Sequence, residues 1–369
     1  MVPPIYQAST FAASSNEEFL EAATRSFSDE FYSRYGNPNH TQVGEVVSVL
    51  EGAERALVTA SGMGALSTLV LSLLEQGDHV VFQRATYPGT SALVESLLQR
   101  FGVTSSAVDQ IGPAALEDAL RPETRLVLLE TPSNPLFDLT DIRACADLAH
   151  RNSSLVAVDN TVATPINQRP LNLGADLVWH SATKYLAGHS DVSAGVIAGR
   201  EEVMERIWRS HLVIGSVLGP FDAWLLLRGL RTLDVRMARH NENGWAIAHA
   251  LHEHPEVESV RYPGLSTHPQ RALAERQMTG YSGMLSFTAI GGAQRADALL
   301  DALRLTTRAA SLGSVHSIAT RPAAMWSDPR QYHSGGDITE GLIRLSIGIE
   351  STQDLLDDFH QALEVTSAP

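Results

Sequence analysis

The sequence His-Ser-Ala-Thr-Lys-Tyr-Leu-Ala-Gly-His-Ser-Asp, residues 180–191, places three reactive side chains directly after a predicted strand at residues 176–180. Ser181 and Thr183 carry hydroxyls that can hold a phosphate group. Lys184, once partly removed from water, has a lowered pKa and can form a Schiff base with an aldehyde. This spacing predicts a site where an amine and an anion-binding surface lie together.

A second predicted strand, residues 155–158, ends at Asp159, 25 residues before Lys184. A carboxylate at the end of a buried strand can pair with a protonated pyridine nitrogen. The amine, the hydroxyls and this carboxylate together describe a pyridoxal 5'-phosphate (PLP) site. Each residue also has an ordinary alternative, since a lysine is usually solvated, an aspartate often caps a turn, and Ser and Thr often bond their own backbone.

Composition limits the class of protein. The 369 residues are 44% apolar and 19% charged, which is typical of a globular chain. The net charge of −15 disfavours nucleic acid and anionic membrane surfaces as partners. Cys145 is the only cysteine, which excludes a disulfide framework and a cysteine metal cluster, and no metal site is expected. We find neither a signal peptide nor an apolar run long enough to span a membrane, so the cytoplasm is the expected location.

From about Thr41 onward, predicted helices and strands alternate, which predicts an α/β fold with a mostly parallel sheet covered on both faces. In such sheets ligands bind beyond the carboxyl ends of the strands. Five polar side chains are predicted at such ends: Ser61, Tyr87, Asn134, Asp159 and Lys184. Their convergence is a stronger indication of a site than any single motif.

The chain is predicted to divide into an N-terminal arm at residues 1–40, a large PLP-binding domain at 41–230 and a smaller α+β domain at 231–369. Near the second boundary, we expect a long helix from residue 221 to about 239, and another at 243–251. Within the arm, Tyr32 and Arg34 alternate along a segment predicted to be extended, an arrangement that suits an anion.

These motifs resemble the trans-sulfuration (Cys/Met metabolism) family of PLP enzymes, which includes cystathionine γ-synthase, cystathionine γ-lyase, methionine γ-lyase and the O-acylhomoserine sulfhydrylases. The resemblance implies PLP fold type I, similar to aspartate aminotransferase. The matching stretches run through the chain in the family's order: residues 3–7, 32–38, 61–63, 77–81, 130–135, 159–161, 163–165, 180–191, 220–223, 228–230, 262–265 and 344–350.

The resemblance also implies roles for individual residues. Lys184 would bind the cofactor and shuttle protons, Asp159 would keep the pyridine nitrogen protonated, and Tyr87 would stack on the ring and help in proton transfer, so these three are the expected catalytic residues. The phosphate would be held by the amides of Gly62 and Met63, the hydroxyls of Ser181 and Thr183, and Tyr32 and Arg34 of a neighbouring subunit. This sharing makes a dimer obligatory, within the homotetramer typical of the family.

For the substrate, the resemblance implies that Arg344 clamps the α-carboxylate, assisted by Asn134 and the backbone of Ser311. Residues 311–327 depart from the family pattern, because His316 replaces a Glu, Arg321 replaces a His, and Trp326-Ser327 replaces Thr-His. Two interpretations remain open, neutral drift or a changed pocket around the far end of the substrate. In the second interpretation, His316 binds substrate. The enzyme then discriminates only weakly in favour of cystathionine and uses an O-acylated homoserine better.

The expected function is γ-replacement or γ-elimination on a four-carbon amino acid, such as an O-acylated homoserine or a cystathionine-like compound. Alternatives are another fold-type-I PLP reaction, namely β-elimination, methionine γ-lyase or aminotransferase activity. Gly89 stands where methionine γ-lyases place a Cys, which counts against that activity. A nucleotide-binding oxidoreductase is disfavoured because no Gly-x-Gly-x-x-Gly follows the first strand, and an inactive scaffold because the cofactor residues are all present.

Overall fold

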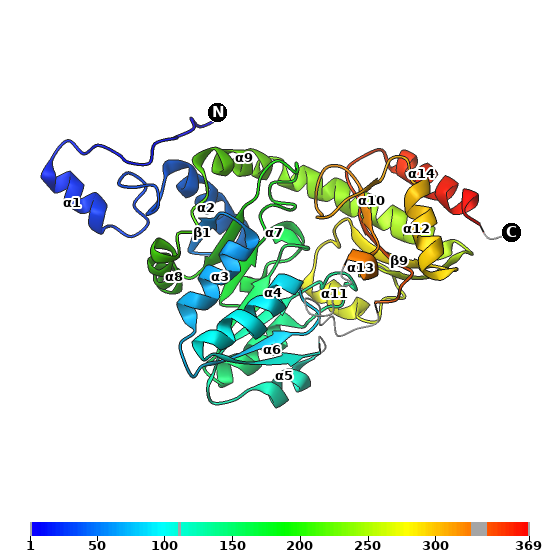
Figure 1. Cartoon of the computed structure of the whole chain (residues 1–369), viewed down its shortest axis with the longest axis horizontal. Helices are drawn as coiled ribbons and strands as arrows, with labels where there is room; N and C mark the ends of the chain where they lie inside the picture. Colours follow the sequence, from blue (N-terminus) through cyan, green and yellow to red (C-terminus); the bar gives the residue numbers. More distant parts are fainter. Residues whose placement is uncertain (1, 110–111, 326–337, 368–369) are drawn as a thin grey trace.

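The computed structural model describes residues 2–109, 112–325 and 338–367 and contains two β-sheets (Figure 1). A seven-stranded sheet has the order β1-β7-β6-β5-β4-β2-β3. Its strands are β1 (Arg55–Thr59), β2 (His79–Gln83), β3 (Thr104–Val108), β4 (Thr124–Glu130), β5 (Leu155–Asp159), β6 (Leu177–His180) and β7 (Gly195–Gly199). Among the described strands of this sheet, β7 alone runs against the others, so the predicted mostly parallel sheet is confirmed.

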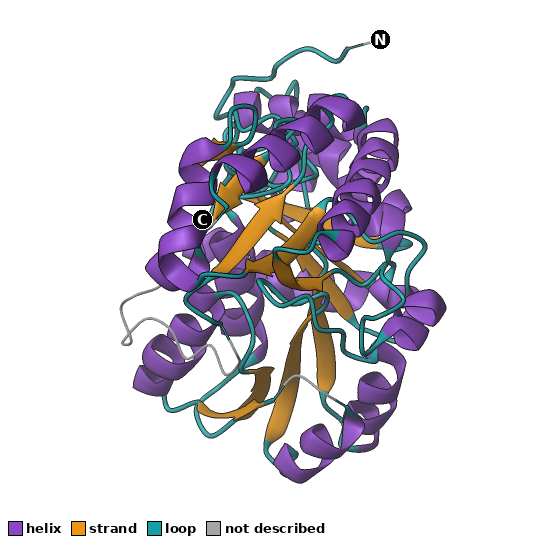
Figure 2. Cartoon of the chain, turned by 90° about the vertical axis from the view of Figure 1, so that its right-hand side faces the viewer, coloured by secondary structure: helices purple, strands orange, loops and turns teal. Residues whose placement is uncertain are grey.

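Helices cover both faces of this sheet, as Figure 2 shows. The helices of this part of the chain are α2 (Pro38–Glu51), α3 (Gly62–Leu73), α4 (Pro88–Ala92), α5 (Pro113–Ala119), α6 (Ile142–Arg151), α7 (Thr164–Asn167), α8 (Glu201–Ile214) and α9 (Pro220–Leu230). Alternate strand residues point to opposite faces. Leu126 and Leu128 therefore join the core beneath α3 and α8, whereas Val127 and Leu129 join the core beneath α5 and α6.

The second sheet has the order β10-β11-β12-β9-β8. It is built from β8 (Val257–Arg261), β9 (Met284–Ala289), β10 (Thr307–Arg308), β11 (Ile318–Thr320) and β12 (Leu342–Ser346). The helices of this part are α10 (Leu233–Glu253), α11 (Arg271–Gln277), α12 (Gly292–Ala302), α13 (Pro322–Met325) and α14 (Thr352–Val365). Its core is packed by α10, α12 and α14. The predicted division of the chain at residues 40 and 230 stays a prediction.

The two helices expected between residues 221 and 251 were placed wrongly. The structure ends α9 at Leu230 and runs α10 without a break through Asn243. The side chain of Arg236 donates to the carbonyl of Gly229 at 2.8 Å and so provides a hydrogen-bond partner for the last turn of α9. The buried amide of Asn243 donates to the carbonyls of Gly348 and Glu350, both at 3.0 Å, and this tertiary contact keeps a turn-forming residue inside a helix.

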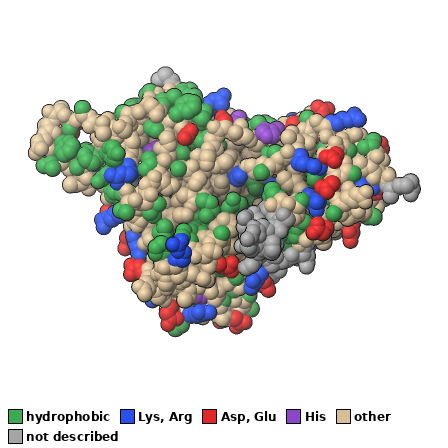
Figure 3. Space-filling model, viewed as in Figure 1, with side chains coloured by type: hydrophobic (Ala, Val, Ile, Leu, Met, Phe, Trp, Pro, Cys, Tyr) green, Lys and Arg blue, Asp and Glu red, His purple; other side chains and the backbone are tan. Residues whose placement is uncertain are grey.

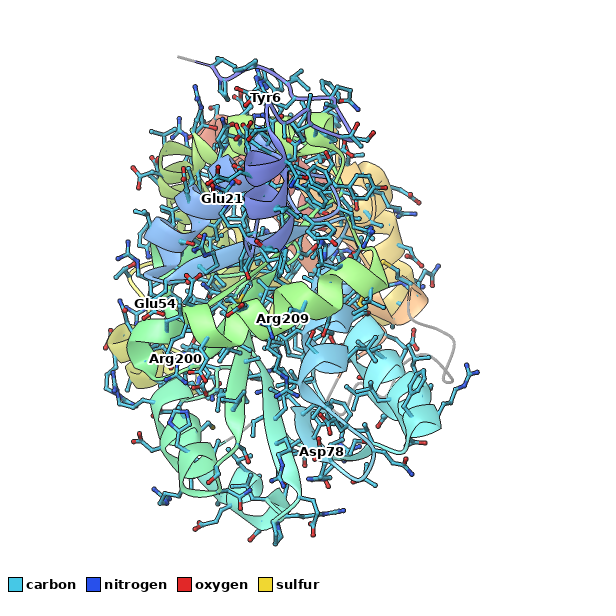
Figure 4. All side chains as sticks on the ribbon, turned by 90° about the vertical axis from the view of Figure 1, so that its left-hand side faces the viewer. Tyr6, Glu21, Glu54, Asp78, Arg200 and Arg209 are labelled. Carbon is cyan, nitrogen blue, oxygen red and sulfur yellow. The ribbon has the colours of Figure 1, made fainter. Side chains whose placement is uncertain are left out.

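The N-terminal arm projects from the rest of the chain (Figure 1). Its helix α1 (Asn16–Thr24) is capped by Ser15 and contains no buried residue. Figure 3 shows hydrophobic side chains gathered on this projection. The exposed apolar residues of the arm include Val2, Phe19 and Leu20. Figure 4 labels Glu21 on α1 and places it on the same side of the molecule as α8.

The segment predicted to be extended around Tyr32 is a turn, because the Tyr35 amide donates to the Tyr32 carbonyl at 2.7 Å. Asn37 and Pro38 form the cap and first residue of α2. Among the described helices, none combines the length and apolar character needed to cross a lipid bilayer.

Candidate active site

A cavity of about 280 Å³ opens at the carboxyl ends of the parallel strands in the larger sheet. Eight of the residues predicted for the site line it together: Gly62, Met63, Tyr87, Asn134, Asp159, Ser181, Thr183 and Lys184. They come from segments more than 120 positions apart in sequence, between Gly62 and Lys184. The topology brings them together because the loops after β1, β2, β4, β5 and β6 all leave the sheet at one edge.

Lys184 supplies an amine to this cavity. It lies in the turn after β6, and its Nζ donates to Ser311 Oγ at 2.6 Å. Burial, with the charge of Arg344 adding to it, lowers the pKa of Lys184 to about 8. A substantial fraction of the amine is therefore neutral near physiological pH, as a nucleophile or base requires. Lys184 is also the only lysine in the chain.

Asp159 supplies a carboxylate at the end of β5, in register with Glu130 on β4 and Trp179 on β6. Its Oδ1 accepts from the amide of Thr161 at 2.9 Å. Burial raises the pKa of Asp159, while the hydrogen bonds from Thr161 and the charge of His180 act in the opposite direction. A cation beside this carboxylate would relieve the cost of burying it.

The start of α3 forms the opposite end of the cavity. Ser61 caps the helix, its Oγ accepting from the Gly64 amide at 2.9 Å, and the amides of Gly62 and Met63 precede the first intrahelical bond. A Cβ built on Gly62 would lie 2.7 Å from Cβ of Ser181, so only a glycine lets the helix start approach the 181–184 turn this closely. Such an exposed helix N-terminus favours an anion.

The hydroxyl of Thr183 has backbone partners in this structure. It accepts from the Ala194 amide at 2.9 Å and donates to the Ala194 carbonyl at 3.2 Å. These bonds hold the turn that carries Lys184 against the segment leading into β7.

Arg344 on β12 lies behind the cavity and is buried. One guanidinium nitrogen donates to Asn134 Oδ1 at 3.3 Å and another to the Ser311 carbonyl at 2.8 Å. Burial lowers the pKa of Arg344 to about 10, and its Nε has no hydrogen-bond partner among the residues the structure describes. A buried guanidinium with an unused N–H donor is suited to binding a carboxylate.

Replacing Arg344 by Lys should raise KM for an amino-acid substrate at least about tenfold with a smaller effect on kcat, because an ammonium cannot reproduce the two-pronged geometry. Steady-state kinetics with Arg308→Lys, an exposed position of the same sheet, as the matched control would measure this. An unchanged KM in the Arg344 variant would remove Arg344 from the substrate site.

The remaining predicted residues lie elsewhere. Arg34 stacks over the ring of Tyr32, at 5.3 Å from its centroid, and donates to the carbonyl of Leu212 at 2.6 Å. It lines a separate cavity of about 650 Å³ between the arm, α2 and β1. Within one chain, therefore, Tyr32 and Arg34 do not line the cavity around Lys184.

Within the altered segment Leu312 lines the cavity, whereas the substituted residues His316 and Arg321 do not. His316 is exposed, with Nδ1 3.1 Å from Ser314 Oγ. Arg321 forms ion pairs at 3.0 Å with both Asp297 and Glu340. The predictions for Trp326 and Ser327 lie outside the described residues. No contact among the described residues supports a substrate-binding role for His316, which stays a prediction.

Two features of the site were missed by sequence reasoning. Glu130 lines the cavity beside Asp159, and the Ser311 side chain contacts Lys184. The strand-end rule that identified Asp159 also applies to Glu130, the last residue of β4. Nothing local marks Ser311, whose φ of 87° is set by the tertiary fold.

The residues present fit PLP. The glycine start of α3 forms a cradle that a Cβ would fill, which suits a phosphate. Asp159 offers a carboxylate for a ring nitrogen, and Lys184, with its lowered pKa, offers an amine for an aldehyde. The cavity volume of about 280 Å³ is close to the small end of the usual range for ligand sites.

Comparison with known proteins agrees with this fit. The model of a family described as Cys/Met metabolism PLP-dependent enzyme matches residues 1–364. The chain is 44% identical to a cystathionine γ-lyase of Bacillus subtilis over 98% of its length and 93% of that protein's. It is 41% identical to an L-methionine γ-lyase of Treponema denticola over 99% and 92%. It also resembles the structure of cystathionine γ-synthase from Xanthomonas oryzae pv. oryzae in complex with aminoacrylate and cysteine, with a TM-score of 0.93, 40% identity, and coverage of 99% and 93%.

Proposed function

This chain belongs to the Cys/Met metabolism family of PLP-dependent enzymes, and we propose that it catalyses γ-elimination or γ-replacement on a four-carbon amino acid. The predicted PLP fold type I is confirmed by its structural relatives. Two of the relatives are named for cleavage at Cγ, of methionine and of cystathionine. Reaction at Cγ is therefore the activity that the family membership supports best for this chain.

The contacts of Ser311 carry the proposal. Its hydroxyl accepts from Lys184 Nζ at 2.6 Å, and its carbonyl accepts from Arg344 at 2.8 Å. One residue therefore fixes the amine relative to the guanidinium. An α-amino acid needs both groups, one to hold its carboxylate and one to move protons along its carbon chain.

Bound PLP would supply an electron sink for negative charge developing next to the α-carbon of the amino acid. The residues proposed to hold it are Asp159 at the ring nitrogen, Tyr87 at the ring, and Gly62, Met63, Ser181 and Thr183 at the phosphate. Lys184 would take a proton from the α-carbon, and its lowered pKa leaves enough neutral amine for that step. Protonated in turn, the same amine would return a proton when the Cγ substituent departs.

We further propose an O-acylated homoserine or a cystathionine-like compound as the substrate. A Cβ built on Gly89 would lie 2.6 Å from Cε1 of Tyr87 and 2.7 Å from Sδ of Met63. Because methionine γ-lyases are expected to place a Cys at this position, one of those two side chains must sit differently in them. This difference in packing beside the ring weighs against methionine as the substrate.

A substrate panel would test the proposed reaction. Cystathionine, homocysteine, methionine and O-acetyl-, O-succinyl- and O-phosphohomoserine would each be supplied with and without cysteine. Release of 2-oxobutanoate without cysteine indicates γ-elimination, and a new thioether formed with cysteine indicates γ-replacement. Pyruvate release, or consumption of an amino acceptor, would instead identify β-elimination or transamination and contradict the proposal.

We also propose a dimer as the smallest active unit, within a homotetramer that works in the cytoplasm. The support is the projecting arm, whose helix α1 buries none of its residues and whose apolar side chains include Phe19 and Leu20. Exposed apolar side chains on such a segment favour contact with another surface. Tyr32 and Arg34, which lie on this arm, are proposed to reach the phosphate bound by the neighbouring subunit.

Mixing two inactive variants should therefore restore activity. Arg34→Ala damages the site of the neighbour, whereas Lys184→Ala damages its own site, so each hybrid dimer retains one intact site. An equal mixture should recover about a quarter of wild-type activity, since half of the dimers are hybrids. Arg34→Ala alone, taken through the same subunit-exchange procedure, is the control. Absence of recovered activity, after mass spectrometry has shown subunit exchange, would rule out the shared site.

A further inference from the structure

Glu130 is a buried carboxylate in the cofactor cavity, and the chemistry described above gives it no role. It ends β4, is 5% exposed, and lies in register with Asp159 at the end of β5. Neighbouring strands are about 4.8 Å apart, so the cavity holds two carboxyl groups side by side. Two adjacent buried carboxylates repel each other, and the pair is less costly when one of them carries a proton.

The contacts of Glu130 connect it to the segment that carries Tyr87. Its Oε2 accepts from the Tyr87 amide at 2.6 Å and from Thr86 Oγ1 at 2.8 Å. Its own amide donates to the side chain of Gln83, at the end of β2. Tyr87 is the N-cap residue of α4 and lines the cavity. Glu130 therefore links the segment between β2 and α4 to the end of β4, which lines the cavity.

The charges around Glu130 favour its protonated form. Burial, with the negative charge of Asp159 adding to it, raises the pKa of Glu130 to about 8. The other titratable groups that line the cavity or lie behind it are Tyr87, Lys184 and Arg344. Near neutral pH Glu130 is therefore mostly protonated, while the hydrogen bonds from Thr161 and the charge of His180 oppose the rise in the pKa of Asp159.

We propose that Glu130 positions Tyr87 and, in the enzyme without PLP, stores a proton, which it gives up when the ring nitrogen of PLP lies beside Asp159. The cationic ring nitrogen pairs with Asp159 and so removes the repulsion that adds to burial in favouring protonated Glu130. The carboxyl O–H bond of Glu130 breaks, and its proton passes to solvent, or to the ring nitrogen when that arrives unprotonated. No electrons are transferred. The inference rests on the cofactor site proposed above and not on the choice of substrate.

Infrared difference spectroscopy on the full-length enzyme, stripped of PLP and then reloaded at pH 7, tests the stored proton. A group with a pKa of about 8 is roughly nine-tenths protonated at that pH. The carbonyl band of a protonated carboxyl should disappear when PLP binds to the wild type, and should be absent throughout in Glu130→Gln. Glu117→Gln, exposed on α5, is the matched control and should behave as the wild type. A band that survives PLP binding, or that remains in Glu130→Gln, would overturn the stored proton.

Comparison of Glu130→Gln with Glu130→Ala tests the positioning role. Glutamine keeps an acceptor for the Tyr87 amide, whereas alanine removes it. We expect the alanine variant to lose at least about tenfold in kcat and to alter the visible circular dichroism of bound PLP, with glutamine restoring the dichroism. Identical dichroism in wild type and Glu130→Ala would overturn the role. Reduction of bound PLP onto Lys184 checks the cofactor site separately, so failure of that site can be told apart from failure of this inference.

Discussion

Lys184→Ala should abolish turnover and covalent attachment of PLP while leaving the fold intact. Lys184 is the only lysine in the chain, so no other side chain can offer a primary amine. Among the described residues its side chain donates one hydrogen bond, to Ser311, and truncation therefore removes little packing. General acid–base catalysis alone contributes about 10²–10⁴-fold, and the variant loses the nucleophile as well, so a loss of at least about a thousandfold in kcat is expected.

The measurement is borohydride reduction followed by peptide mapping, together with kcat. In the wild type the cofactor should be recovered on one peptide, containing residue 184, and in the variant on none. Lys184→Arg is the matched control, because it keeps the positive charge and much of the volume but has no amine that deprotonates in this range. Turnover retained in Lys184→Ala, or cofactor fixed elsewhere in the wild type, would refute the assignment.

Asp159→Asn should reduce kcat by more than about a hundredfold, which corresponds to a loss of about 3 kcal/mol of transition-state stabilisation. The substitution keeps the shape and the acceptor for the Thr161 amide but removes the negative charge. Without that charge the pKa of a pyridine nitrogen at this position falls, and a neutral ring withdraws electrons less well. Binding of PLP should weaken less than turnover, because the phosphate contacts remain.

Steady-state kinetics and equilibrium titration with PLP would measure the two effects separately. Asp118→Asn, on the exposed side of α5, makes the same change in net charge far from the site. If Asp159→Asn turned over at the wild-type rate while containing a full complement of PLP, Asp159 would not be the partner of the ring nitrogen.

Several features could be predicted from the sequence because the physical signal is local. Alternating helices and strands require a mostly parallel sheet, and a parallel sheet places the carboxyl ends of its strands at one edge. Asp159 and Lys184, each at or just after a strand end, were therefore expected to meet before any contact was known. The start of the helix after Ser61 can also be predicted from the sequence, since Ser followed by glycines caps a helix and exposes its first amides.

Other features depended on contacts between residues far apart in sequence. The unbroken helix α10 is held by Asn243 donating to carbonyls more than 100 residues away, which overrides the local preference of Asn-Gly for a turn. The link from Lys184 through Ser311 to Arg344 joins residues 127 and 33 positions apart. The ionisation of Glu130 depends on burial and on Asp159 in the adjacent strand. Local propensity acts over a few residues, whereas burial and long-range hydrogen bonds arise only when the chain is packed. The tertiary structure alone therefore determined the course of α10, the link through Ser311 and the ionisation of Glu130.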